Sequence, residues 1–144
     1  MLVDVITQNV EDTLQAQRLG ADWVELVSAR SEGGLTPSYG TVKRVLREVS
    51  IPLQIMVRPH NYGFVYSKKD WLTMEEDISI IRELGGDRIV IGAITNDGEI
   101  DKAFLEKVIK HAPDFDITFH RAFDRVRCPV PSYQTLSKYN NHIK

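Results

Sequence analysis

Three side chains of chemically useful type fall at or near the ends of predicted strands. Glu25, Arg58 and His120 supply a carboxylate, a guanidinium and an imidazole. A carboxylate can act as a general acid or base, and so can an imidazole, whose unperturbed pKa is about 6.5. A guanidinium can hold an anion through two parallel hydrogen bonds. We therefore expect Glu25 and His120 to be catalytic and Arg58 to bind a ligand.

The loops that follow the predicted strands add further polar side chains. Ser28, Asp97, Arg121 and Asp124 are the other candidates for ligand binding. The pair Gly33–Gly34, in the same loop as Ser28, can turn backbone N–H groups toward an anion. Together these groups predict a pocket for a small anionic ligand.

Each candidate also has a purely structural interpretation. A buried Glu25 is costly unless it is paired, and Arg58 or Arg121 can neutralise it in an ion pair. His120 can equally be a satisfied core histidine, and the glycine pair a plain turn. The sequence leaves these alternatives open.

Short apolar runs alternate with amphipathic segments along the chain. The runs 2–7, 23–27, 53–57, 88–92 and 116–119 are typical of strands. Asn9, Ser38 and Asp101 are expected to cap helices that end near residues 19, 49 and 111. Thr73 with Glu76 matches a capping box for one more helix.

The repeated strand and helix order predicts a parallel sheet. One set of alternating strand residues is wholly apolar, whereas the opposite set mixes apolar bulk with charge. An open sheet between two helix layers is usually apolar on both faces, but a barrel admits polar groups at one end of its interior. We therefore expect an α/β fold of the TIM (β/α)8 barrel type, incomplete, with about the first five strands and four helices.

The composition is that of an ordinary globular protein. The chain has 144 residues, 42% of them hydrophobic, and a formal net charge of -2. This balance gives no basic field for nucleic acid or a membrane surface, so a small molecule or another protein is the expected partner. With one cysteine and no pattern of a signal peptide at its start, the chain is expected to be cytoplasmic.

Six segments, in this order and spacing, resemble the CutC copper homeostasis family. They are 20–26, 31–38, 57–59, 64–67, 92–101 and 118–124. The resemblance implies a TIM barrel, a cytoplasmic protein linked to copper tolerance or trafficking, and homo-oligomers. It also implies that a pocket at the barrel mouth is lined by Glu25, Arg58, His120, Arg121 and Asp124.

The chain departs from the family at the positions suited to copper. Some relatives carry cysteines where Ile6 and Val27 stand here. Cu(I) prefers thiolate and thioether ligands, and this chain offers only Cys128 and Met56. Copper is therefore suspected from the resemblance but is not supported by the ligand residues of this chain. The segment 60–63 also differs from the family pattern.

The resemblance predicts two regions, a partial barrel at 1–124 and a divergent tail at 125–144. Back-translating residues 130–144 with chosen codons and reading one nucleotide later yields a sequence typical of a helix and a strand, so we hypothesise a frameshift. A TIM barrel typically takes about 250 residues, so the chain corresponds to its front part, with open strand edges that favour association.

Three functions follow from these observations. The first is a copper homeostasis protein that binds a small anionic ligand or metal complex. The second is a barrel enzyme on a small phosphorylated or anionic metabolite, with His120 or Glu25 as acid or base. The third is an inactive truncated fragment.

Overall fold

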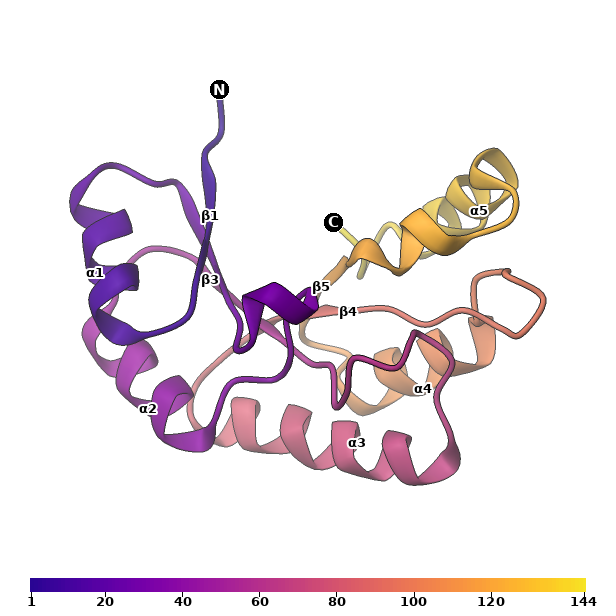
Figure 1. Ribbon diagram of the computed structural model, residues 1–144, viewed down its shortest axis with the longest axis horizontal. Coiled ribbons are helices and arrows are strands. Elements are labelled where there is room, and N and C mark those ends of the chain that lie inside the picture. Colours follow the sequence, from indigo (N-terminus) through magenta and orange to yellow (C-terminus); the bar gives the residue numbers. More distant parts are fainter.

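The computed structural model describes residues 1–144 and builds them around one parallel sheet (Figure 1). Its five strands lie side by side in chain order. They are β1 Asp4–Thr7, β2 Trp23–Leu26, β3 Leu53–Met56, β4 Arg88–Ile91 and β5 Asp116–Phe119. Since β1 has a neighbouring strand on one side only, the sheet is an open arc, and the expected incomplete barrel is confirmed.

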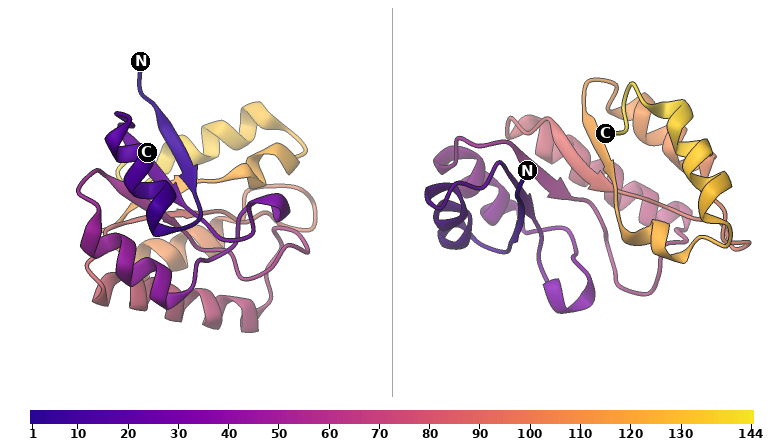
Figure 2. Two further views of the ribbon diagram at one scale, coloured as in Figure 1. Left: turned by 60° about the vertical axis from the view of Figure 1, so that its left-hand side comes forward. Right: turned by 90° about the horizontal axis from the view of Figure 1, so that it is seen from above.

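Four helices connect successive strands. They are α1 Val10–Arg18, α2 Tyr39–Glu48, α3 Lys68–Glu83 and α4 Lys102–His111. Figures 1 and 2 show them wrapped around the outer, convex side of the curved sheet. None of the helices combines the length and the apolar character that a bilayer crossing requires.

Side-chain caps begin three of these helices where the sequence predicted. Asn9 accepts a hydrogen bond from the backbone N–H of Asp12, and Asp101 accepts one from that of Phe104. Ser38 caps α2 in the same way. Each of these oxygens satisfies one N–H that the first helical turn leaves without a partner.

The capping box predicted at Thr73 is wrong. Helix α3 begins at Lys68, because Ser67 accepts from the backbone N–H of Asp70 and Asp70 accepts from that of Ser67. Thr73 lies in the second turn and donates its hydroxyl to the carbonyl of Lys69. The reciprocal pair at residues 67 and 70 satisfies both backbone donors, so the helix starts there.

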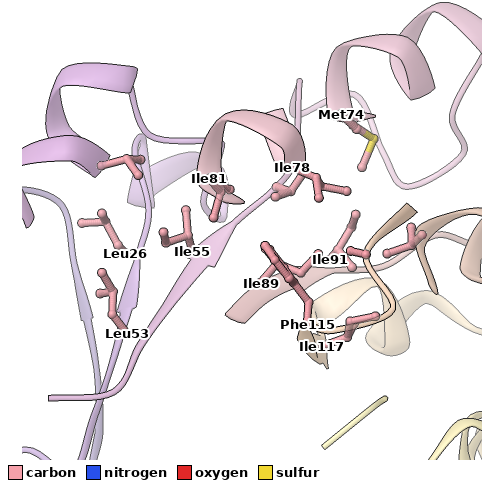
Figure 3. Close-up of a cluster of buried hydrophobic side chains, with 14 of the residues drawn as sticks. Leu26, Leu53, Ile55, Met74, Ile78, Ile81, Ile89, Ile91, Phe115 and Ile117 are labelled. Atoms are coloured by element: carbon pink, nitrogen blue, oxygen red, sulfur yellow. The ribbon is translucent and has the colours of Figure 1, made fainter. Parts of the chain in front are cut away.

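The core lies between the sheet and the helices, as the alternation of strand residues predicts. Leu26, Ile55, Ile89 and Ile117 point outward from their strands and are fully buried (Figure 3). Helix α3 covers them with side chains that include Ile78. Burial of each such side chain stabilises the fold by roughly 1.5–3 kcal/mol.

The inner face of the sheet carries a chain of polar contacts. Gln54 donates to the Asp4 carboxylate at 2.7 Å and accepts from the Thr118 hydroxyl at 2.7 Å. These residues come from β1, β3 and β5, which matches the layers that alternate strands build inside a closed barrel. The inner face is therefore built as a barrel interior, although the arc is open.

The last twenty residues pack against the edge of β5. Helix α5 covers Pro129–Leu136, and Pro129 fits its first position because no N–H is needed there. Beyond it, Ile143 pairs with Ile117 in parallel. The chain end thus lies where a sixth strand would pair (Figure 2).

Candidate functional site

Two adjoining pockets open where the strands end. We call the first the strand-end pocket; it has a volume of about 440 Å³ and is lined by Glu25, Met56, Thr118 and His120, among others. We call the second the arginine pocket; its volume is about 550 Å³. The arginine pocket is lined by twelve residues, which include Glu32, Arg58, Asn61, Phe64, Arg121 and Arg125. Gly33 and Arg121 line both pockets.

Glu25 faces the inner side of the sheet from β2 and is half-buried. The expected ion pair with Arg58 or Arg121 is not formed, because Arg58 points to backbone carbonyls instead. Burial, and to a lesser degree the charge of Asp4, raises the pKa of Glu25 from 4.5 to about 7. An unpaired carboxyl group of this kind can take up and release a proton near neutral pH.

His120 follows β5 and is only 6% exposed. Its Nδ1 accepts a hydrogen bond from the backbone N–H of Ala122 at 3.2 Å. Burial, and then the charges of Arg58 and Arg121, lower the pKa of His120 to about 4. Both causes favour the neutral imidazole of His120 at physiological pH.

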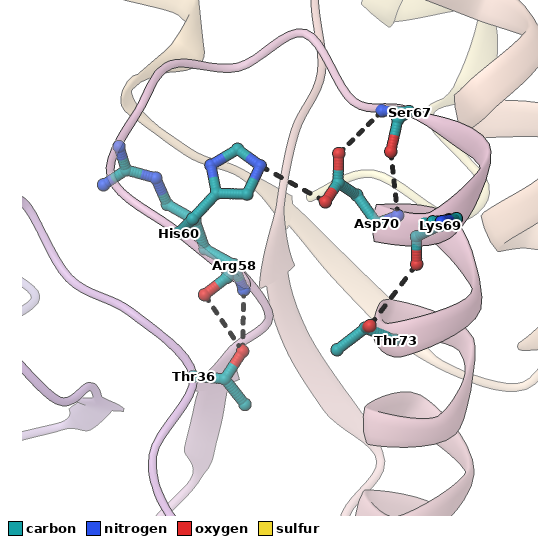
Figure 4. Close-up of polar contacts among 7 residues, drawn as sticks. All are labelled: Thr36, Arg58, His60, Ser67, Lys69, Asp70 and Thr73. Atoms are coloured by element: carbon teal, nitrogen blue, oxygen red, sulfur yellow. Dashed lines mark hydrogen bonds and ion pairs between the residues drawn. The ribbon is translucent and has the colours of Figure 1, made fainter.

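Arg58 lies two residues after the end of β3 and is buried, with 4% of its surface exposed. It donates to the carbonyls of Glu32 and Gly34, both at 3.1 Å, and its guanidinium lies 4.5 Å from the centre of the Phe64 ring. Thr36 holds its backbone from the other side, accepting from its N–H at 2.9 Å (Figure 4). Arg58 is therefore a fixed positive charge at the wall of the arginine pocket.

The loop after Arg58 is fastened to the start of α3. His60 Nε2 lies 3.5 Å from the Asp70 carboxylate, and Figure 4 shows the imidazole turned toward it. Asn61 donates to the carboxylate of Glu32 in the loop after β2. The segment 60–63, which departs from the family pattern, thus closes one side of the arginine pocket.

The glycine pair serves packing and not anion binding. Both N–H groups are used inside the turn, since Gly33 donates to the carbonyl of Arg30 and Gly34 to that of Ala29. Gly33 has a φ of +86°, and a Cβ there would come within 2.9 Å of Arg121 Nη1. Only glycine lets this loop approach the arginine so closely.

Three of the predicted ligand-binding residues stand apart from both pockets. Ser28 donates its hydroxyl to the carbonyls of Leu35 and Thr36, which fastens its own loop. Asp97 and Asp124 are exposed and line neither pocket. The structure thus brings together Glu25 and His120 with Arg121, and places Arg58 in the adjoining pocket.

Arg125 lines the arginine pocket and was missed by the sequence analysis. It lies in the short 3-10 helix η2, Arg121–Arg125, at the opposite end from Arg121. The spacing of two arginines directly after a strand was the available signal. It was overlooked because the residue falls just beyond the expected boundary at 124.

The side chains of this chain do not fit a copper ion. Ile6 and Val27, which replace the thiols of some relatives, both line the strand-end pocket as hydrocarbons. Cys128 is exposed and lies elsewhere, and no three His, Cys, Asp or Glu side chains gather closely enough to hold a metal. Met56 alone offers a soft donor here.

Known proteins are similar to this chain over most of its length. The model of the CutC family matches residues 1–140, which is past the expected boundary at 124. The copper homeostasis protein cutC homolog of Homo sapiens is 41% identical over 135 residues, 94% of this chain and 50% of that protein. A family protein CutC of Salmonella typhimurium is 39% identical over 136 residues, 94% of this chain and 55% of that protein. The chain spans about half the length of the curated relatives it matches.

Solved structures show the same relationship. The copper homeostasis protein CutC from Streptococcus agalactiae superposes with a TM-score of 0.88 and 30% identity, over 97% of this chain and 70% of that chain. A structure of PhdJ bound to a substrate intermediate gives a TM-score of 0.62 at 14% identity, over 97% of this chain and 50% of that chain. The second similarity is one of fold alone.

Proposed function

The chain belongs to the CutC family, and from that premise we propose that it serves copper homeostasis in the cytoplasm by binding a small anionic ligand, or an anionic metal complex, in the arginine pocket. The unpaired arginines of that pocket carry the proposal. A cytoplasmic location agrees with the cysteine content, because the single cysteine has no second cysteine in the chain with which to form a disulfide.

The charge balance of the arginine pocket favours an anion. Arg58, Arg121 and Arg125 face it with one carboxylate, that of Glu32, so three positive charges against one negative leave two unbalanced. None of the three guanidinium groups forms an ion pair within the chain. Guanidinium groups without a counter-ion bind phosphate or carboxylate through charge-assisted hydrogen bonds.

The side chains of the strand-end pocket argue against direct copper binding. The strand-end pocket presents hydrocarbon where thiolates would be needed, and its thioether, Met56, has no second soft donor beside it. Copper would therefore reach this chain as a complex whose anionic ligands meet the arginines.

Titration calorimetry with inorganic phosphate tests the anion site. Arg121→Ala and Arg125→Ala should each weaken phosphate binding roughly tenfold, because a charge-assisted hydrogen bond is worth about 1.5–3 kcal/mol. Arg47→Ala, at an exposed position on α2, is the matched control and should bind like the unmodified chain. Equal affinity for all three variants would contradict the proposal.

A competition assay tests the copper argument. With Cys128→Ser, the chain should take no Cu(I) from a chelator such as bathocuproine disulfonate, whereas a Cu(II)–citrate complex should bind and lose affinity in Arg121→Ala. Stoichiometric Cu(I) binding by Cys128→Ser would show that the pocket itself supplies copper ligands.

A further inference from the structure

The strand-end pocket holds two groups that anion binding does not use. Glu25 has no counter-ion, and Nε2 of His120 is buried without a hydrogen-bond partner. Part of the wall around them is apolar and includes Val27, Met56 and Val90. Most buried polar atoms have a hydrogen-bond partner, so an unpartnered one in a residue that lines a pocket points to a catalytic or ligand-binding role.

The contacts of His120 fix which nitrogen carries its hydrogen. Nδ1 must offer a lone pair, since it accepts the N–H of Ala122 at 3.2 Å. A neutral ring then carries its hydrogen on Nε2. The ring is held from one side by Phe64, with centroids 5.1 Å apart, and from another by Gly92, where even a Cβ would come within 2.7 Å of Nδ1. His120 is thus an oriented hydrogen-bond donor and not a base.

Glu25 is the group of this pocket that can move a proton. Asp4 lies beside it on β1, and Arg30, His120 and Arg121 line the same pocket, so one negative and two positive charges and a neutral imidazole surround it. Its pKa near neutrality makes both protonation states accessible at pH 7. Glu25 and His120 therefore supply a movable proton and an N–H donor to the lining of one pocket.

We propose that the strand-end pocket abstracts a proton from carbon next to a carbonyl group in a small substrate that carries phosphate or carboxylate. This inference rests on the proposed function, because the substrate's anion lies in the arginine pocket. The two pockets share Gly33 and Arg121, so one small molecule can reach both.

The step balances without any further reactant. The carboxylate of Glu25 takes the proton, the C–H electron pair forms the C=C bond, and the carbonyl π pair moves to oxygen. The resulting oxyanion accepts the Nε2–H of His120. Glu25 then exchanges its proton with solvent and returns a solvent-derived proton to the same carbon, which restores the carbonyl group and completes the exchange.

Proton exchange with solvent tests this step without knowledge of the natural substrate. In D2O, NMR should show deuterium entering dihydroxyacetone phosphate or pyruvate next to the carbonyl, with a rate that rises with pH and reaches half its plateau near pH 7. Glycerol phosphate, which lacks the carbonyl, should not exchange.

Variants purified in parallel identify the groups and exclude a contaminating isomerase. Glu25→Gln should lower the exchange rate at least a hundredfold, whereas Glu83→Gln, exposed on α3, should leave it unchanged. His120→Ala should lower the rate about a hundredfold, and His120→Gln, which keeps an N–H donor, should recover part of it.

Three results would overturn the inference. If the unmodified chain binds phosphate but exchanges neither carbonyl compound, the anion site stands and the proton transfer is wrong. If exchange persists in Glu25→Gln, the assignment of the base is wrong. If phosphate does not bind at all, the proposed function and this inference fail together.

Discussion

Glu25 lies beside Asp4 on the inner face of the sheet, and its burial makes the stability of the chain depend on pH. Because its pKa rises from 4.5 to about 7 on folding, the folded state binds this proton more tightly than the unfolded state. The resulting stabilisation is complete below about pH 4.5 and is lost as the pH rises through about 7.

Glu25→Gln should therefore be more stable than the unmodified chain at pH 8, by about 1–2 kcal/mol after solvent screening, and equal to it near pH 4.5. Urea unfolding at several pH values measures this difference. The titration of His120 occurs in both chains and cancels. A difference that does not change with pH would show that Glu25 is already ionised freely in the folded chain.

Gly92 is the second residue on which the site depends. A methyl group there would meet Nδ1 of His120 at 2.7 Å and the Phe119 ring at 3.1 Å. Gly92→Ala should destabilise the chain by about 1–3 kcal/mol, because a close-packed site has no room for it. Gly40→Ala, with nothing within 4 Å of its Cβ, should instead stabilise helix α2 by about 0.5–1 kcal/mol. Thermal unfolding of both variants compares them, and equal melting temperatures would contradict the packing argument.

The types and positions of the site residues could be predicted from sequence, but their states could not. Glu25, Arg58 and His120 follow from the position of strand ends, which local alternation reveals. The missing ion pair of Glu25 and the lowered pKa of His120 depend on Phe64 and on the carbonyls that hold Arg58, all of which belong to distant loops. No local pattern reports those distances.

At the scale of elements, the start of α3 shows how two local signals compete. Ser67 with Asp70 and Thr73 with Glu76 both fit a capping pattern. The structure uses the first, which starts the helix six residues earlier and places the Asp70 carboxylate 3.5 Å from His60. The other three caps were predicted correctly because each has a single local signal.

Two substitutions distinguish these starts. Ser67→Ala should cost about 0.5–2 kcal/mol, because it removes the true cap. Thr73→Ala should be neutral or slightly stabilising, since alanine is the better residue inside a helix. Chemical unfolding gives both values, and a loss at Thr73 as large as that at Ser67 would return the helix start to residue 73.

At the scale of the whole molecule, the alternation of strand residues predicted the curved sheet, because one apolar face and one mixed face favour a barrel wall over an open sheet between two helix layers. The tail could not be predicted, since its helix begins with Pro129 and its pairing with β5 rests on Ile143 alone. The family match extends to residue 140, and Ile143 pairs with β5. Both observations fall within residues 125–144, which were expected to form a separate tail. The frameshift stays a hypothesis that the nucleotide sequence of the gene tests.

The free edge of β1 governs how the 144-residue chain behaves in solution. It pairs with β2 only, and beside this edge Ile6 is 45% and Leu2 78% exposed. An unpaired strand edge next to exposed apolar side chains favours pairing with another chain. We therefore expect the chain on its own to form homo-oligomers whose contact includes β1.

Light scattering coupled to size-exclusion chromatography measures this association. Ile6→Lys should shift the chain toward the monomer, because a lysine at a strand edge opposes edge-to-edge pairing. Leu72→Lys, at a 58% exposed position on the outer helix α3, removes a comparable apolar side chain away from the edge and should leave the mass unchanged. A monomeric unmodified chain, or equal masses for the two variants, would show that β1 is not the contact.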